Sequence, residues 1–127
     1  MKKIIETKNA PAPLGPYNQA VMAKDTLYLS GQIPIDPVTN ALVEGDLEKE
    51  THQVMKNLSA VLSAAGMTFE NVVKTSIFLR DMNNFATVNT IYGSYFNEKT
   101  APARETVEVA NLPKFVRIEI SMIAVTA

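Results

Sequence analysis

Residues 46–79, DLEKETHQVMKNLSAVLSAAGMTFENVVKTSIFL, predict a helix followed by a strand. Between 46 and 65 acidic side chains occupy the first turn, and Gly66 follows the last periodic position, as is typical of helix ends. Residues 72–79 have the composition of a strand, with apolar side chains on both faces. Together they indicate a layered fold of both element types. The apolar positions of the helix recur at three- and four-residue spacing: Leu47, Val54, Met55, Leu58, Val61, Leu62 and Ala65.

The segments on either side extend this pattern to an α+β fold. Upstream, residues 18–22 and 26–30 predict a hairpin, and a proline-rich loop at 10–16 precedes it. Downstream, we expect a second helix over about 84–96 and then two more strands. The aromatic positions at helical spacing in that helix, which include Phe85 and Tyr92, are interpreted as core rather than as ligand contacts. The order strand, hairpin, helix, strand, helix, strand, strand predicts a single domain over 1–127, with two helices on one face of a sheet.

Two helices can cover only one face of such a sheet. The other face still carries apolar side chains, from the strand at 72–79 and from Ile123 and Val125 near the end of the last strand. An uncovered apolar sheet face in a small protein is usually buried by another subunit. We therefore expect a homo-oligomer in which sheet faces meet.

Composition and charge narrow the classes of function. The chain is 46% hydrophobic and 20% charged, which is ordinary for a folded domain with a core. A net charge of -1, without a cluster of Lys and Arg, disfavours nucleic acid and anionic membranes as partners. The absence of cysteine removes thiolate chemistry, and a single histidine, His52, leaves no histidine cluster for a metal. With no signal-peptide core or membrane-spanning run, the expectation is a soluble cytoplasmic protein.

An arginine and a carboxylate on two neighbouring strand-like segments, 102–107 and 116–120, form the candidate chemical centre. Strand alternation puts Arg104 and Thr106 on one face of the first segment and Glu105 on the other. In the second segment, Val116 to Ile120, Glu119 lies opposite the apolar positions. An arginine fork suits a planar carboxylate ligand, and a carboxylate nearby could orient or activate water. A structural ion pair between Arg104 and Glu119 explains the same residues equally well, so both interpretations stay open.

Ser30 and Gly31 end the second strand of the hairpin. A glycine there lets backbone N–H and C=O groups approach a ligand with no Cβ in the way, although a bulge or a strand end requires an isolated glycine at least as often. The Ser30 hydroxyl could donate to a ligand or satisfy its own local backbone.

Short motifs occur in order along the whole chain: Ala10-Pro11, Gly15-Pro16-Tyr17, Ser30-Gly31-Gln32-Ile33-Pro34, Asn84-Phe85-Ala86-Thr87-Val88-Asn89, Pro102-Ala103-Arg104, Val107-Glu108-Val109-Ala110, Leu112-Pro113-Lys114 and Ile118-Glu119-Ile120. Each motif is short, but the ordered set is specific. Through it the chain resembles the RidA/YjgF family, the reactive-intermediate deaminases, from its first residue to its last.

That resemblance implies a chorismate-mutase-like fold with a mixed β-sheet, assembled as a homotrimer with clefts between adjacent subunits. It also implies an enzyme of the 2-iminobutanoate/2-iminopropanoate deaminase type. Such enzymes hydrolyse 2-aminoacrylate and its imine tautomer to a 2-oxo acid and ammonium, and they need neither a metal nor a cofactor.

The resemblance further implies a role for each candidate residue. Arg104 would clamp the substrate carboxylate bidentately, and the backbone of Gly31 would hydrogen-bond the imine nitrogen. Glu119 would position the attacking water, and Tyr17 would supply a hydroxyl at the cleft. Three further residues are candidates for the substrate site: Ser30, Asn89 and Thr106.

Two positions depart from the family pattern. Family members of this type usually carry a small residue and then a cysteine after the motif arginine, where this chain has Glu105 and Thr106. We expect Thr106 to change the shape of the pocket more than its chemistry. The Glu105 charge could neutralise Arg104 or repel a substrate carboxylate.

Two other functions therefore stay open. One is a non-catalytic regulatory module that binds 2-oxo acids or amino acids in the intersubunit clefts. The other is RNA cleavage or translation inhibition, which the lack of a basic groove and of a histidine pair disfavours.

Overall fold

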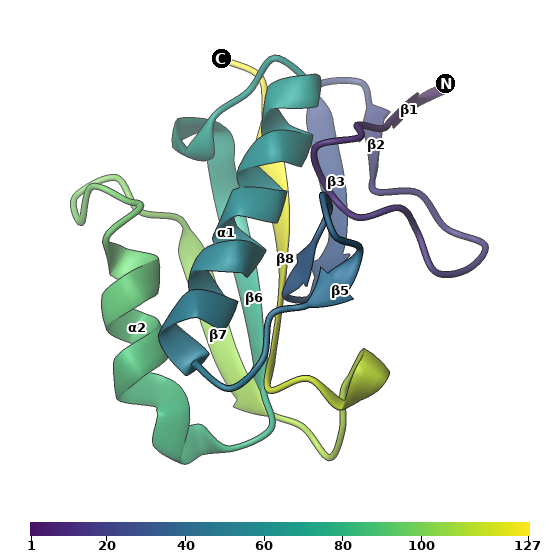
Figure 1. The fold of residues 1–127 in the computed structure, drawn as a ribbon. Coiled ribbons are helices and arrows are strands. Elements are labelled where there is room, and N and C mark those ends of the chain that lie inside the picture. Colours follow the sequence, from purple (N-terminus) through teal and green to yellow (C-terminus); the bar gives the residue numbers. More distant parts are fainter.

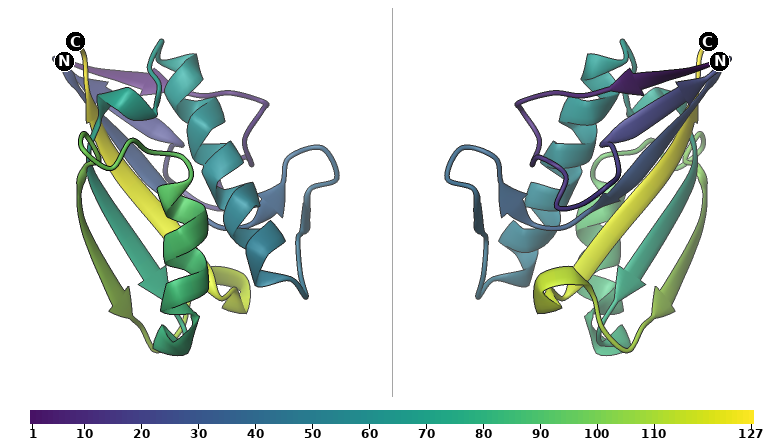
Figure 2. Two further views of the ribbon diagram at one scale, coloured as in Figure 1. Left: turned by 90° about the vertical axis from the view of Figure 1, so that its left-hand side faces the viewer. Right: turned by 90° about the vertical axis from the view of Figure 1, so that its right-hand side faces the viewer.

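A six-stranded sheet lies behind two α-helices in the computed structural model, which describes residues 1–127 (Figure 1). Its strands are β1 (Lys2–Ile5), β2 (Ala20–Ala23), β3 (Thr26–Gln32), β6 (Val72–Leu79), β7 (Ala103–Glu108) and β8 (Ile118–Val125). They are ordered β1-β2-β3-β8-β6-β7, and only the β6–β7 pair is parallel, so the sheet is mixed. Both helices cover the same face (Figure 2). The predicted α+β class is confirmed.

Helix α1 (Leu47–Ala64) lies within one residue of the first predicted helix at each end. Its N-terminus is capped by Asp46, whose side chain accepts hydrogen bonds from the N–H groups of Glu48 and Lys49 at 3.0 and 3.2 Å. Beyond its C-terminus Gly66 has a φ of 73°, the left-handed conformation that ends many helices. The caps and the apolar stripe therefore made this element predictable.

Helix α2 (Phe85–Gly93) is shorter than the helix predicted over 84–96. The hydroxyl of Ser94 donates to the carbonyl of Ile91 at 2.5 Å, and the chain continues from there in tighter turns. Because α2 connects the parallel strands β6 and β7, it forms the crossover of a βαβ unit. Neither α-helix combines the length and the hydropathy that crossing a bilayer requires.

A second, two-stranded sheet was not predicted from the sequence. It pairs β4 (Ile35–Asp36) with β5 (Ala41–Leu42), and Asn57 of α1 holds it in place. The Asn57 side-chain amide donates to the carbonyls of Ile33 and Ile35 at 3.2 and 2.9 Å. Asn57 thus satisfies buried carbonyls within the apolar stripe of its helix and fixes the segment that follows Gly31.

Replacing Asn57 with alanine is expected to destabilise the protein by about 1–3 kcal/mol, because buried carbonyls would lose their donor. The unfolding free energy from urea titration measures the effect. Ser59→Ala, on the exposed side of the same helix, is the control and should change stability little. Equal stabilities for the two variants would contradict the anchoring role of Asn57.

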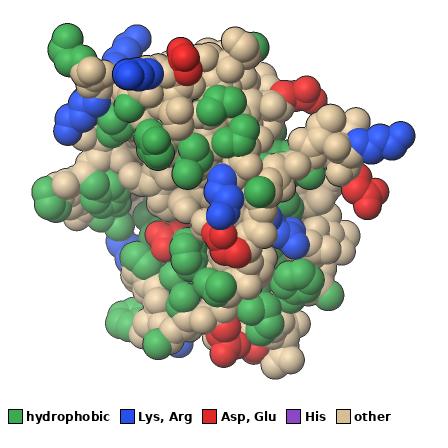
Figure 3. All heavy atoms as spheres, turned by 180° about the vertical axis from the view of Figure 1, so that it is seen from behind, with side chains coloured by type: hydrophobic (Ala, Val, Ile, Leu, Met, Phe, Trp, Pro, Cys, Tyr) green, Lys and Arg blue, Asp and Glu red, His purple; other side chains and the backbone are tan.

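The two faces of the sheet differ in what covers them. On the helix-covered face, every second side chain of β6 and β8 is buried in the core. The opposite face is open, and hydrophobic side chains gather on it between scattered charged ones (Figure 3). On β6 this open face carries Lys74 and Ser76 as well as Phe78, so it is more polar than the sequence suggested. Its exposed or half-buried apolar side chains include Tyr28, Val73, Phe78, Val107, Ile123 and Val125.

Candidate active site

Arg104 and Glu119 lie on opposite faces of the sheet, on strands that are not neighbours. Arg104 on β7 is in register with the buried Thr75 of β6, so its side chain leaves the helix-covered face. Glu119 on β8 is in register with Phe78, on the open face. The prediction that the two segments are neighbours is wrong, because β6 pairs between them. No ion pair joins Arg104 to Glu119 in this chain, so the structural alternative does not explain them.

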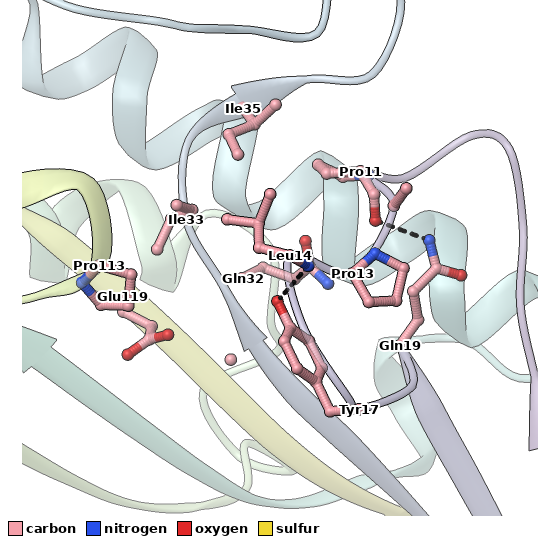
Figure 4. A pocket seen from close by; sticks show the side chains of 12 residues that line it. Pro11, Pro13, Leu14, Tyr17, Gln19, Gln32, Ile33, Ile35, Pro113 and Glu119 are labelled. Carbon is pink, nitrogen blue, oxygen red and sulfur yellow. Dashed lines mark hydrogen bonds between the residues drawn. The ribbon is translucent and has the colours of Figure 1, made fainter.

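Glu119 belongs to a pocket beside the end of β3 (Figure 4). The pocket brings Glu119 together with two other predicted site residues, Tyr17 and Gly31. One wall is the proline-rich loop, and another is formed by the chain that follows Gly31. Pro113, in the turn before β8, closes the side next to Glu119. Three segments far apart in the sequence therefore build this half of the site.

The Glu119 side chain crosses directly over Gly31. A Cβ at position 31 would lie 2.6 Å from Oε2 of Glu119 and 2.7 Å from its Cδ, which is closer than real contacts allow. The pairing of β3 with β8 also shifts register between Leu29 and Gln32, so a bulge is present at the glycine. The φ of Gly31 is not positive, so the bulge does not by itself require glycine, whereas the approach of the Glu119 carboxylate to the backbone does.

Burial raises the pKa of the Glu119 carboxyl above its ordinary value, and no other group opposes that shift. Its oxygens thus remain available to a ligand or a water molecule. A partly desolvated carboxylate without a fixed partner has the properties of a general base.

Tyr17 and Ser30 differ in the hydrogen bonds that they can still make to a ligand. The N–H of Leu14 donates to the Tyr17 hydroxyl oxygen at 3.1 Å, which leaves the hydroxyl proton of Tyr17 free to be donated. The Ser30 hydroxyl donates to the carbonyl of Asn18 at 2.6 Å. Ser30 therefore satisfies local backbone with its proton and can offer a ligand only its oxygen.

Gln19 holds the proline-rich loop and was not singled out from the sequence. The side chain is 3% exposed, and its oxygen accepts the N–H of Thr7 at 2.7 Å. Its amide nitrogen lies within hydrogen-bond distance of the carbonyls of Thr7, Ala10 and Pro11. One buried amide therefore sets the shape of the loop that carries Tyr17, and only its position after that loop could have suggested this role.

Arg104 is held by one face of α2. Its Nη1 donates to Oδ1 of Asn89 at 2.8 Å. Its Cζ lies 5.2 Å from the ring centroid of Tyr92 and 5.7 Å from that of Phe85. Asn89 is thus brought to the predicted arginine, whereas Phe85 and Tyr92 were interpreted only as core positions. Their helical spacing relative to Asn89 was the available signal.

Glu105 and Thr106 follow the predicted alternation. Glu105 lies on the open face, where its carboxylate is 2.7 Å from Lys74 Nζ and accepts a hydrogen bond from Ser76. These partners, Lys74 first, lower the pKa of Glu105. The charge is therefore paired on the face opposite Arg104, which weakens the expected neutralisation of that arginine. On the other face, the buried hydroxyl oxygen of Thr106 has no hydrogen-bond partner.

Potential metal ligands do not gather at this site. No three His, Asp or Glu side chains lie close enough together to hold an ion. The single histidine, His52, has its Nδ1 2.6 Å from the hydroxyl of Tyr95, in an aromatic cluster between the helices. The chemistry available at the pocket is therefore that of a carboxylate, a phenol and backbone groups.

The whole chain is similar to known proteins. The family described as Endoribonuclease L-PSP matches residues 7–126. A RutC family protein of Synechocystis is 58% identical over 97% of this chain and 95% of its own length. The 2-iminobutanoate/2-iminopropanoate deaminase of Mus musculus is 50% identical over 98% of this chain and 92% of its own. The crystal structure of a Yersinia pestis protein of the conserved Rid family has a TM-score of 0.96 at 53% identity, covering 99% of this chain and 100% of that one.

Proposed function

The chain belongs to the RidA/YjgF family, and we propose that it hydrolyses 2-imino acids such as 2-iminopropanoate and 2-iminobutanoate to 2-oxo acids and ammonium. One observation carries the proposal: an unpartnered Glu119 carboxylate lies against the backbone of Gly31 in a pocket that also holds Tyr17. The activity named for the mouse relative supports it.

Each complete site forms between two adjacent copies of a homotrimer. A substrate as small as 2-iminopropanoate must meet Arg104 and Glu119 at once, yet within one chain these side chains leave opposite faces of the sheet. A neighbouring copy resolves this, because Arg104 is exposed on the edge strand β7 and can enter the pocket of another chain. Burial of the open apolar face supplies a driving force for that assembly.

Within this cleft the substrate is oriented before it reacts. The guanidinium of Arg104 takes the carboxylate in two parallel hydrogen bonds and fixes the plane of the substrate. The backbone of Gly31 receives the imine nitrogen. The hydroxyl of Tyr17 donates a hydrogen bond to the substrate. Asn89 and Thr106 lie beside Arg104. Such positioning supplies much of the rate enhancement when the reaction needs no cofactor.

The chemistry is addition of water followed by loss of ammonia. Glu119 accepts a proton from water while the water oxygen bonds to C2 of the protonated imine, and the C=N electron pair moves to nitrogen. Glu119 then returns the proton to nitrogen, the C–N bond breaks, and the hydroxyl proton passes to the departing ammonia. A 2-oxo acid and ammonium remain.

A turnover assay tests the proposal. 2-Aminoacrylate is generated from serine by a pyridoxal-phosphate dehydratase, and pyruvate release is followed with and without the protein. We expect faster release with the wild type and the uncatalysed rate with Glu119→Gln. Stabilisation by 2-oxobutanoate without faster release would overturn the proposal in favour of a regulatory binding module. Cleavage of an RNA substrate in parallel would point instead to the activity in the family's description.

Glu119→Gln is also expected to raise the melting temperature near neutral and alkaline pH. Because the folded pKa of Glu119 lies above the unfolded value of about 4.3, the native state binds its proton more tightly, and stability is lost as pH rises through the folded pKa. The amide removes that loss, so the gain over wild type should be larger at about pH 8 than at about pH 4. Differential scanning fluorimetry at both values measures it.

Glu98→Gln, on the exposed surface, is the control and should show no such trend. A gain for Glu119→Gln that shrinks with rising pH would contradict the buried carboxylate.

A further inference from the structure

One stripe of α2 faces Arg104. Phe85, Asn89 and Tyr92 are spaced by four and then three residues, so their side chains leave the same side of the helix. All three contact the guanidinium: Asn89 accepts a hydrogen bond from it, and the two aromatic rings lie within cation–π distance. The contact is thus a platform with two rings and one acceptor.

A buried hydrogen bond fixes the nearer ring of this platform. The Tyr92 hydroxyl donates to Oγ1 of Thr75 at 2.9 Å, and these residues are 5% and 0% exposed. Thr75 is also the residue in register with Arg104 in the parallel β6–β7 pair. Burial raises the pKa of Tyr92, which keeps its hydroxyl protonated and able to donate, although Thr75 and Arg104 oppose the shift. The ring therefore has a fixed orientation relative to the strand that carries the arginine.

The platform leaves part of the Arg104 fork free. Only its Nη1 has a protein acceptor, so Nε and Nη2 remain available on one edge. Arg117 shows what such an edge binds in this protein, because its Nε and Nη2 both donate to the carboxylate of Glu50. The Nε–Nη2 edge of Arg104 is therefore free, and it is the same edge with which Arg117 binds a carboxylate.

We propose that Tyr92, locked by its hydrogen bond to Thr75, is a positioning residue that holds the Nε–Nη2 edge of Arg104 in the orientation that receives the carboxylate of a 2-imino or 2-oxo acid. Phe85 and Asn89 complete the platform. The inference rests on the proposed function for the identity of the ligand. A long arginine side chain loses conformational freedom when it is held in one geometry, and the platform imposes that loss before the ligand arrives.

Calorimetric titration with 2-oxobutanoate tests this role without requiring turnover. Tyr92→Leu removes both ring and lock and is expected to weaken binding about tenfold, the scale of a lost cation–π contact. Tyr92→Phe keeps the ring, and Thr75→Val keeps the shape of the acceptor residue, so each should weaken binding about threefold. If the two act as one lock, the double variant should bind no more weakly than either single variant.

Tyr95→Phe is the matched control. The substitution removes another tyrosine hydroxyl close to the same helix, one that is hydrogen-bonded to His52 rather than placed beside Arg104. The variant should bind 2-oxobutanoate like the wild type. In turnover assays the Tyr92 and Thr75 variants should raise KM more than they lower kcat, because Arg104 keeps its fork and still contacts the carboxylate once the substrate has bound. If Tyr92→Leu does not fold, Tyr92→Phe and Thr75→Val carry the test.

The outcomes separate this inference from the proposed function. Loss of binding in Arg104→Ala together with wild-type affinity in the Tyr92 and Thr75 variants would overturn the positioning role alone, even if those variants melt at lower temperature. A wild-type protein that binds 2-oxobutanoate but does not accelerate imine hydrolysis would overturn the proposed function and leave the positioning role supported by its binding data. A wild type that neither binds 2-oxobutanoate nor accelerates imine hydrolysis would overturn both.

Discussion

Mixed trimers of Arg104→Ala and Glu119→Gln are expected to hydrolyse 2-aminoacrylate, although neither variant does so by itself. The two side chains leave opposite faces of one chain, so in the proposed trimer each cleft takes them from different copies. A cleft that pairs the intact Arg104 of a Glu119→Gln chain with the intact Glu119 of an Arg104→Ala chain is complete. Random assembly from equal amounts should make about a quarter of the clefts complete.

Each single substitution should lower turnover strongly. Removing a general base typically costs about 10²–10⁴-fold in rate. Arg104→Ala removes a charged bidentate contact, and Arg104→Lys keeps the charge but loses the fork, so both should also lower turnover sharply. Circular dichroism should show intact folds, since Arg104 is exposed and Glu119 only half-buried. Near-normal turnover by either Arg104 variant would remove this residue from the site.

The control mixture combines Arg104→Ala with Arg104→Lys. Both chains then lack the same half of the site, and no cleft can be restored. Native mass spectrometry of differently tagged chains shows whether subunits have mixed. If mixed trimers form and the Arg104→Ala and Glu119→Gln pair stays inactive, Arg104 and Glu119 do not serve the same cleft from adjacent copies.

Gly31→Ala is the second substitution with a large expected effect. The new Cβ would lie 2.6–2.9 Å from three atoms of the Glu119 side chain, which must move away. Displacing a catalytic group by about an ångström can cost about 10²-fold in rate, so we expect a loss of that size in kcat/KM. Pyruvate release from 2-aminoacrylate measures it. The fold should survive, because the atoms in conflict belong to a side chain rather than to backbone.

Two further variants show whether Glu119 causes that loss. Gly93→Ala adds the same methyl group where nothing lies within 4 Å, and it should keep wild-type turnover. In a Glu119→Ala background the conflict at position 31 is absent, so Gly31→Ala should lower the free energy of unfolding less there than in the wild type. An equal decrease of that free energy in both backgrounds would mean that the backbone of β3, rather than Glu119, requires the glycine.

The elements that could be predicted were those whose signal is local. Asp46, Gly66 and the apolar spacing between them locate α1 to within a residue at each end. The second helix was predicted too long. After Gly93 the backbone N–H groups of residues 94–96 donate to carbonyls three residues back rather than four, and apolar periodicity does not register that change. The β4–β5 hairpin was missed because its strands are short and depend on Asn57, which is distant in sequence.

The residues of the candidate site also differ in whether a local signal in the sequence predicts them. Arg104, Glu119, Gly31 and Tyr17 could be named from motifs, and the alternation that separates Arg104 from Glu105 follows from strand geometry. The supporting residues could not be named, because Gln19, Thr75 and Tyr92 act through hydrogen bonds to segments that only folding brings close. Asn89 was named as a possible ligand contact, and the structure places it on Arg104.

The family, the α+β class and the residue types of the candidate site follow from the order of residues along the chain, because motifs, periodicity and strand alternation are properties of that order. The fold adds that Arg104 and Glu119 are separated by β6 and leave opposite faces of the sheet. The reason is physical. Which strands pair depends on hydrogen bonds and side-chain packing between segments far apart in the chain, and no local pattern encodes that choice.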